Sequence, residues 1–177
     1  MKISKNKKNF LYFNDSDIRC LFKNFSDLSK NEIISISKLK SENFKIINEE
    51  NSNQINILDH RSHHFLILYG KKLIGYSRLV PPDFNFNKLT LEKFCVSKDF
   101  RNMGISKILM KSIFEKIQKL YPLETIYLSS LEETKKFYEK FGFFSEYLIY
   151  DENGKPHHHM TKKFKKIDFN TLAIDAA

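Results

Sequence analysis

The segment 91–117 (LEKFCVSKDFRNMGISKILMKSIFEKI) constrains the fold more than any other part of the chain. It begins as an apolar strand, passes through a short basic turn with one glycine, Gly104, and continues as an amphipathic helix. A strand that leads into a helix places the free backbone N–H groups of the helix N-terminus at the end of a sheet. Such groups bind anions, so this segment predicts a site for the diphosphate of a nucleotide-bearing cofactor.

Hydrophobic periodicity divides the sequence into the strands and helices of one α/β domain, 1–177. We expect a leader at 1–14, short helices at 15–30 and 33–44, the second capped by Ser29 or Asn31, and a polar loop at 48–62. The later elements are strands at 65–69, 73–80, 88–96, 125–129, 143–150 and 157–164, and helices at 104–120 and 132–141. The strand–helix–strand unit at 88–129 requires parallel strands, so the sheet should be mixed. The leader and the tail from Lys165 are expected to be mobile.

With 177 residues, 41% hydrophobic and 29% charged, the chain can bury one real core. Its longest apolar run, 65–69, is too short to cross a membrane, and no apolar segment follows the basic N-terminus as a secretory signal would require. Neither the two cysteines, Cys20 and Cys95, nor the six histidines have metal-ligand spacing. We therefore expect a cytoplasmic protein without a metal.

The formal net charge of +9 indicates attraction to an anion, which could be a nucleic acid, a membrane or a phosphorylated ligand. The lysines are scattered along the chain, and abundant Lys, Asn, Ile and Phe are typical of AT-biased coding. We therefore expect neither a nucleic-acid nor a membrane partner, although a phosphate-rich cofactor would benefit from the positive field.

Two motifs resemble those of the GNAT acyl-CoA N-acetyltransferases. The cofactor motif of that family, Arg/Gln-x-x-Gly-x-Gly/Ala after a strand that ends in Val, is matched by Val96, Arg101, Gly104 and Ser106, with serine as the last small residue. A second motif, Phe-Tyr-x-x-x-Gly-Phe, stands at 137–143. The resemblance covers about 37–164. It implies an α/β GNAT fold with a central mixed, mostly antiparallel, twisted sheet of about six to seven strands, flanked by helices on both faces.

Two narrower resemblances bear on the substrate. The ending Tyr-x-x-Asp-Gly-x-Pro-His-x-x-Met of the ElaA-like branch is similar to residues 150–160, with Asn153 in place of Asp. The strand that carries Glu92 and the helix at 137–142 are similar to those of glucosamine-phosphate N-acetyltransferases. The resemblance implies acetyl transfer to a small phosphorylated amine, with glucosamine 6-phosphate as the first candidate, by direct attack of the amine on the thioester.

The family resemblance implies acetyl-CoA as the acyl donor and assigns the residues that hold it. Its pyrophosphate would lie on the N–H groups of residues 102–106, with charge added by Arg101 and Lys107. Its pantetheine arm would pair with the strand that ends at Val96. The implied cofactor-binding residues are Phe94, Cys95, Val96, Arg101, Asn102, Met103, Gly104, Ile105, Ser106, Lys107, Tyr138 and Lys140.

Three residues carry the chemistry that the resemblance implies. The backbone N–H of Val96 would bind the thioester carbonyl, and Tyr138 would protonate or orient the coenzyme A thiolate. Glu92 would activate the amine directly or through water; with a two-residue period it should share a face with Phe94 and Val96. The alternatives are a salt bridge from Glu92 to a lysine or to Arg78, and a half-buried aromatic role for Tyr138.

Residues of the acceptor pocket are the least constrained by the sequence. The candidates are His64, Arg78, Lys93, Glu152 and His157, although ordinary hydrogen-bonded histidines are an alternative. Other small amines or a protein amine stay open as acceptors, as does a non-catalytic module that binds coenzyme A. The family resemblance also implies a homodimer.

Overall fold

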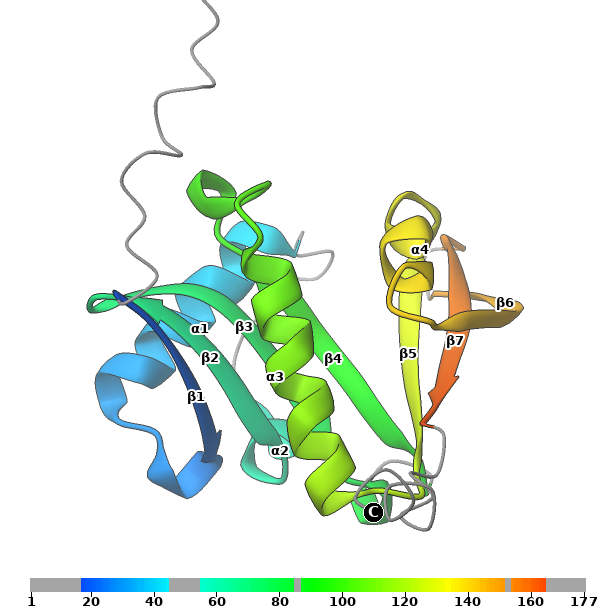
Figure 1. Ribbon diagram of the computed structural model, residues 1–177, viewed down its shortest axis with the longest axis horizontal. Helices are drawn as coiled ribbons and strands as arrows, with labels where there is room; N and C mark the ends of the chain where they lie inside the picture. Colours follow the sequence, from blue (N-terminus) through cyan, green and yellow to red (C-terminus); the bar gives the residue numbers. More distant parts are fainter. Residues whose placement is uncertain (1–16, 45–54, 85–86, 152–153, 165–177) are drawn as a thin grey trace, which may run out of the picture. The chain divides into compact units, whose positions relative to one another are not determined.

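The computed structural model describes residues 17–44, 55–84, 87–151 and 154–164 (Figure 1). The chain forms two compact units, Met1–Ile113 and Phe114–Ala177. Seven strands lie in the described residues, in the order β1-β2-β3-β4 in the first unit and β5-β7-β6 in the second. Neighbouring strands within each unit pair antiparallel. No helix in these ranges is long and apolar enough to cross a bilayer.

The first unit is built on four strands that follow one another across the sheet. They are β1 (Ile18–Asn24), β2 (His63–Tyr69), β3 (Lys72–Val80) and β4 (Leu89–Val96). The β2–β3 hairpin turns at Gly70, whose φ of 57° is one that glycine adopts without strain. Short 3₁₀ turns at Phe25–Asp27, Pro82–Phe84 and Lys98–Phe100 end or follow strands.

Helices cover both faces of these strands (Figure 1). Helix α1 (Lys30–Asn43) starts at Ser29, whose side chain accepts from the backbone of Glu32 in a capping box, so Ser29 is the cap rather than Asn31. One apolar face of α1 packs on the strands in a core of Leu28, Ile36, Leu39, Leu66, Leu68, Leu73, Tyr76 and Cys95. Helix α3 (Ile105–Leu120) begins on the opposite face. There a β-carbon at Gly75 would lie 3.3 Å from atoms of Ile67 and Ile105.

Two predictions for the first unit are wrong. The helix expected at 15–30 is strand β1 followed by a 3₁₀ turn, because its backbone groups pair with those of β2 from Ile18 opposite Tyr69 to Asn24 opposite His63. Tertiary pairing decides the structure of a short apolar segment whose spacing also fits a helix. The loop expected at 48–62 contains helix α2 (Ile57–His60), and its Asp59 is fully buried.

The second unit contains the end of α3, β5 (Thr125–Leu131), α4 (Glu132–Glu139), β6 (Phe144–Tyr150) and β7 (Pro156–Lys163). Helix α4 ends before Gly142, whose φ of 80° is the left-handed conformation in which a glycine often follows a helix. The ring of Phe114 packs against those of Phe141, Phe143 and Phe164. The elements expected at 125–129, 132–141, 143–150 and 157–164 are therefore present with small shifts of their ends.

Candidate active site

The turn for which the sequence predicted anion binding lies between β4 and α3. Asn102 and Gly104 have φ values of 62° and 81°, a left-handed conformation that suits asparagine and glycine. Among the hydrogen bonds formed by the described residues, none is donated by the N–H groups of residues 102–106. A β-carbon at Gly104 would meet no atom within 4 Å. The turn thus offers a row of N–H groups on an open surface at the end of β4.

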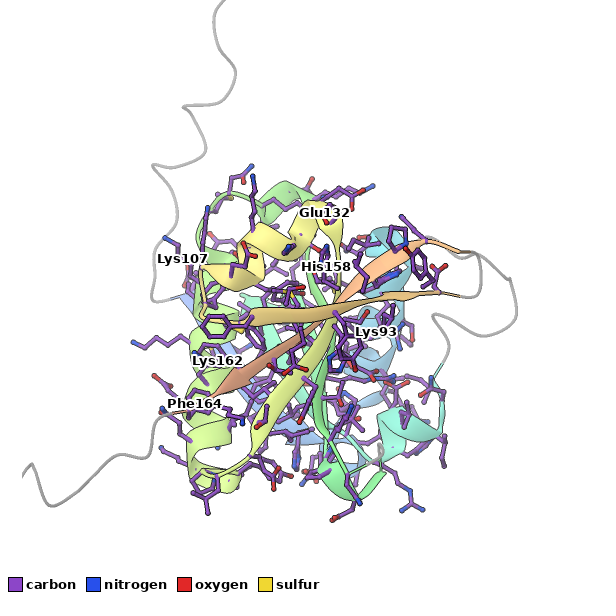
Figure 2. All side chains as sticks on the ribbon, turned by 90° about the vertical axis from the view of Figure 1, so that its right-hand side faces the viewer. Lys93, Lys107, Glu132, His158, Lys162 and Phe164 are labelled. Atoms are coloured by element: carbon purple, nitrogen blue, oxygen red, sulfur yellow. The ribbon has the colours of Figure 1, made fainter. Side chains whose placement is uncertain are left out.

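Arg101 braces this turn from one side. Its Nη2 donates to Asn43 Oδ1 at 2.6 Å and its Nε to the Val96 carbonyl at 3.3 Å, which ties the turn to the ends of α1 and β4. Lys107 is exposed one helical turn further on (Figure 2). Of the other predicted cofactor residues, Ile105 is buried, and Met103 and Ser106 are half-buried. These two therefore meet a ligand more readily through the main chain than through the side chain.

A β-bulge in β4 changes the direction of the predicted catalytic side chains. Tyr76 pairs with Cys95 and Arg78 pairs with Glu92, so three residue steps in β4 match two in β3. The bulge falls at Lys93, whose φ is 52°. Residues directly opposite in an antiparallel pair share a face, so Glu92 shares the face of Cys95. The prediction that Glu92, Phe94 and Val96 share one face is therefore wrong.

Cys95 turns its side chain into the core beneath α1. Burial raises the pKa of its thiol to about 12, so the thiol stays protonated at neutral pH. Only the main chain of Cys95 is left to contact a cofactor along β4.

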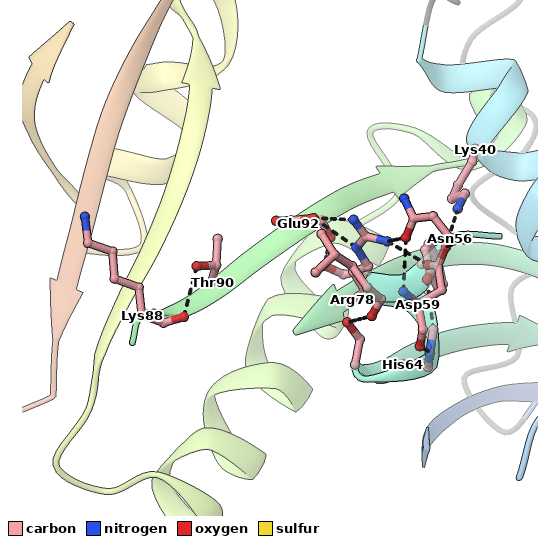
Figure 3. Close-up of polar contacts among 12 residues, drawn as sticks. Lys40, Asn56, Asp59, His64, Arg78, Lys88, Thr90 and Glu92 are labelled. Atoms are coloured by element: carbon pink, nitrogen blue, oxygen red, sulfur yellow. Dashed lines mark hydrogen bonds and ion pairs between the residues drawn. The ribbon is translucent and has the colours of Figure 1, made fainter. Parts of the chain in front are cut away.

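Glu92 is the outer end of a chain of alternating charges, which we call the ion-pair chain: Lys40, Asp59, Arg78 and Glu92 (Figure 3). Arg78 donates from Nε and Nη2 to Glu92 Oε2 at 2.9 and 2.6 Å, and from Nη1 to Asp59 Oδ1 at 2.8 Å. Lys40 Nζ lies 3.4 Å from Asp59 Oδ2. The formal charges of the four residues cancel, and the salt bridge to Arg78 that the sequence left open for Glu92 is present.

The capping of α2 places Asp59 at the centre of this chain. The Asp59 carboxylate accepts from the backbone N–H of Asn56 at 3.0 Å, and the Asn56 side chain accepts from the backbone N–H of Asp59. Burial alone would raise the pKa of Asp59, but the Asn56 hydrogen bond and the charges of Arg78 and Lys40 outweigh it and lower the pKa. Sequence reasoning missed this residue, although its Asn-x-x-Asp spacing is a capping-box signal.

Lys40 responds differently to the same environment. Burial lowers the pKa of Lys40, and the attraction of Asp59 offsets only part of this. The geometry explains the contrast with Asp59, because Asp59 has Arg78 as a 2.8 Å partner while its contact with Lys40 is 3.4 Å long. Arg78 is thus the main counter-charge of Asp59.

His64 and Arg78, two predicted acceptor residues, are buried with relative exposures of 1% and 2%. His64 Nε2 lies 2.9 Å from the Asp59 carbonyl, which can only accept, so Nε2 carries the proton and Nδ1 accepts from the Tyr76 hydroxyl at 2.9 Å. Both side chains are thus too buried for the direct contact with an acceptor that was expected. His64 binds the backbone of Asp59, and Arg78 binds the carboxylates of Asp59 and Glu92.

Of the predicted acceptor residues in the first unit, Lys93 is the one whose side chain is partly exposed. Its side chain is half-buried, with the ammonium 5.3 Å from the centre of the Phe44 ring. Burial, followed by the charge of Arg78, lowers the pKa of Lys93. It lies next to Glu92 in sequence and interacts with it electrostatically.

The remaining predicted residues belong to the second unit. Tyr138 is half-buried on α4, with its ring 5.0 Å from Phe137 and 5.9 Å from Phe143, and Lys140 is exposed at the end of that helix. His157 is half-buried, with Nδ1 3.0 Å from the Lys155 carbonyl. Glu152 lies outside the described residues. Their roles stay predictions.

A hydrogen-bonded triad that the sequence did not indicate ties α4 to the last hairpin. His158 contacts the Glu132 carboxylate through Nε2 (Figure 2) and the Ser145 hydroxyl through Nδ1 at 2.8 Å. His158 is buried. In the described part of the chain, no group of three or more His, Cys, Asp or Glu could hold a metal ion.

A family model described as an acetyltransferase (GNAT) domain matches residues 25–164. The match covers most of the chain, so the chain belongs to the GNAT acetyltransferase family and is an acyltransferase. Its sequence is 25% identical to that of Protein ElaA of Escherichia coli over 142 residues, which are 78% of this chain and 92% of ElaA.

Solved structures confirm the fold that the sequence predicted. An acyl-CoA N-acyltransferase from Pseudomonas aeruginosa aligns with a TM-score of 0.72 at 22% identity, over 82% of this chain and 99% of that one. ElaA of E. coli aligns with a TM-score of 0.67 at 19% identity and the same coverage. An aminoglycoside 6'-N-acetyltransferase complexed with coenzyme A aligns with a TM-score of 0.68 at 16% identity, over 84% and 99%. All are mixed α/β folds of the kind described above.

The buried histidine predicts a pH dependence of stability. Burial lowers the pKa of His64 from its usual 6.5, so below that pH the unfolded chain gains a proton that the folded protein does not take up. Stability should therefore fall between about pH 7.5 and about pH 5.5. A His64→Gln variant keeps a donor and an acceptor without titrating. Its midpoint of unfolding in urea should therefore fall less on acidification than that of the wild-type protein. Equal losses in both proteins would contradict this.

Proposed function

We propose that the protein is an acetyl-CoA-dependent N-acetyltransferase that acylates the primary amine of a small phosphorylated acceptor within one catalytic domain. The observation that carries the proposal is the open turn at 101–106, which follows the strand that bears Glu92. The turn offers backbone N–H groups for a diphosphate, and the strand offers a carboxylate for the amine. Family membership and the coenzyme A complex of the aminoglycoside enzyme support acetyl-CoA as the donor.

The residues present fit this cofactor. A pyrophosphate would lie on the N–H groups of residues 102–106, where Gly104 leaves the surface open and the positive end of α3 adds to the attraction. Lys107 is exposed and adds charge. The pantetheine arm would run along the main chain of Phe94, Cys95 and Val96, with the Val96 N–H as the donor to the thioester carbonyl. One such donor contributes about 3 kcal/mol to the transition state.

The chemical step needs one proton removed and one supplied. The neutral amine attacks the thioester carbon, its nitrogen forms the amide bond and the carbon–sulfur bond breaks. Glu92 takes the proton from the amine, directly or through water. Tyr138 gives or orients the proton for the coenzyme A thiolate, which leaves as the thiol.

Charge around Glu92 supports an acceptor that carries an anionic group as well as an amine. The ion-pair chain is neutral, so the half-buried ammonium of Lys93 is an uncompensated charge beside it. Glucosamine 6-phosphate is the first candidate on this ground. Another small amine or a protein amine is the alternative. We further propose a cytoplasmic homodimer, for which the exposed apolar side chains of β6, such as Phe144 and Leu148, provide a surface.

A thiol-release assay with paired acceptors tests this function. Glucosamine 6-phosphate should be turned over with a much higher kcat/KM than glucosamine, because the two differ only in the phosphate. A polyamine and a short peptide with a free N-terminus represent the alternative acceptors. Equal kcat/KM for the two sugars would reject the phosphorylated acceptor. No turnover with any amine, together with coenzyme A binding, would favour a non-catalytic module.

Gly104→Ala should weaken coenzyme A binding at least tenfold, since the added methyl group occupies the surface on which the diphosphate would lie. Gly70→Ala is the matched control, because Gly70 also has positive φ and open space around it but lies in the β2–β3 turn. Both variants carry similar backbone strain, so titration calorimetry separates strain from blockade. Equal affinities of the two variants would argue against a diphosphate site at the turn 101–106.

Tyr138→Phe should slow the single-turnover rate on the order of 100-fold, because it removes the proton that the leaving thiolate needs. Coenzyme A affinity should change little, since the ring packing against Phe137 and Phe143 is kept. Rapid-quench measurement of the acetylated product gives this rate. A wild-type rate would remove Tyr138 from the chemical step.

A further inference from the structure

Arg78 is fixed on both sides of its guanidinium group. Nε and Nη2 bind Glu92, and Nη1 binds Asp59 and the Asn56 side chain at 2.8 and 3.1 Å. The side chain is only 3% exposed. A planar guanidinium held by two carboxylates in a buried position has essentially one orientation.

Glu92 has one oxygen engaged and one available. Both Arg78 contacts go to Oε2, and no residue in the described ranges donates a hydrogen bond to Oε1. The Glu92 side chain is 25% exposed, whereas those of Lys40, Asp59 and Arg78 are at most 3% exposed. Of the four residues of the ion-pair chain, Glu92 is therefore the one whose side chain reaches solvent to an appreciable extent.

Stability alone does not account for such an arrangement. Removing charges from water costs several kcal/mol per ion, and apolar residues of similar size often stabilise a core as well or better. Buried ion pairs do fix geometry, because each partner that moves leaves another charge unpaired. Here Asp59 is itself held by the Asn56 N–H and Lys40, so Arg78 cannot follow Glu92 outward.

We infer that Arg78 is a positioning residue for the acetyl transfer, which Asp59 anchors, and that it presents Glu92 Oε1 to the acceptor amine. This inference rests on the proposed function. During reaction Oε2 stays on Arg78 while Oε1 receives the amine proton, as the amide bond forms and the carbon–sulfur bond breaks. Arg78 itself touches neither substrate nor cofactor.

A double-mutant cycle tests the inference. Arg78→Gln and Glu92→Gln should each lower kcat on the order of 100-fold, the loss expected when a reacting group is removed or displaced by about 1 Å. The double variant should be no slower than Glu92→Gln, because Arg78 acts only through Glu92. The KM for acetyl-CoA should stay within about twofold of wild type in all three variants, since none of them changes the turn at 101–106.

Arg78→Lys keeps the experiment decisive if Arg78→Gln does not fold. A lysine retains the charge beside Asp59 but lacks the planar guanidinium that holds Glu92 in one orientation, so kcat should fall at least tenfold while the melting temperature stays near that of wild type. Arg19→Lys is the matched control, because Arg19 lies at the surface of β1. Within the described residues, the side chain of Arg19 donates a hydrogen bond to the Gly70 carbonyl and to no other group.

The outcomes separate the two proposals. Losses that multiply in the double variant, or a wild-type kcat for Arg78→Lys, would overturn the positioning role while leaving the acetyltransferase intact. A wild-type protein that neither binds coenzyme A nor releases thiol would instead overturn the proposed function, and the inference with it.

Discussion

The left-handed backbone of Lys93 determines where the candidate catalytic groups of β4 point. With regular alternation, Glu92 and Cys95 would lie on opposite faces of the strand. The bulge at φ 52° gives them the same face, so that Glu92 meets Arg78 while Cys95 enters the core under α1. A non-glycine residue in this conformation costs about 1–2 kcal/mol. Two hydrogen bonds from Arg78 to Glu92 form only because the strand is bent in this way.

The segment before β2 is polar because its side chains build the ion-pair chain. Asn56 and Asp59 cap α2 and, at the same time, supply the acceptors for Nη1 of Arg78. His64 completes the arrangement, since its protonated Nε2 binds the Asp59 carbonyl and its Nδ1 the Tyr76 hydroxyl. Asp59 thus joins four elements: its carboxylate binds Lys40 of α1 and Arg78 of β3, and its backbone carbonyl binds His64 of β2. The same carboxylate holds the arginine that reaches β4.

Local patterns predicted the parts of this structure that local forces determine. A single glycine predicts the turn at 97–104, and a periodic apolar face predicts α3 after it. A Ser-x-x-Glu spacing predicts the cap at Ser29. Strand β1 could not be predicted in this way, because its spacing fits a helix and only pairing with β2 decides it. The bulge at Lys93 has no local signal either, since lysine does not favour positive φ. The role of Glu92 therefore stays a prediction, and the face that the sequence predicted for it was wrong.

A salt bridge and a general base were alternatives for Glu92 in the sequence, and the geometry makes them compatible. An ion pair that used both carboxylate oxygens would leave neither oxygen wholly open to a substrate, whereas Arg78 binds Oε2 alone. The charge of the Glu92 carboxylate is then balanced within the ion-pair chain, and the ammonium of Lys93 remains as the excess charge next to it. An acceptor that carried only an amine would bring a second positive charge to this place. An acceptor with a phosphate in addition would balance it, which supports on electrostatic grounds the phosphorylated amine that we propose.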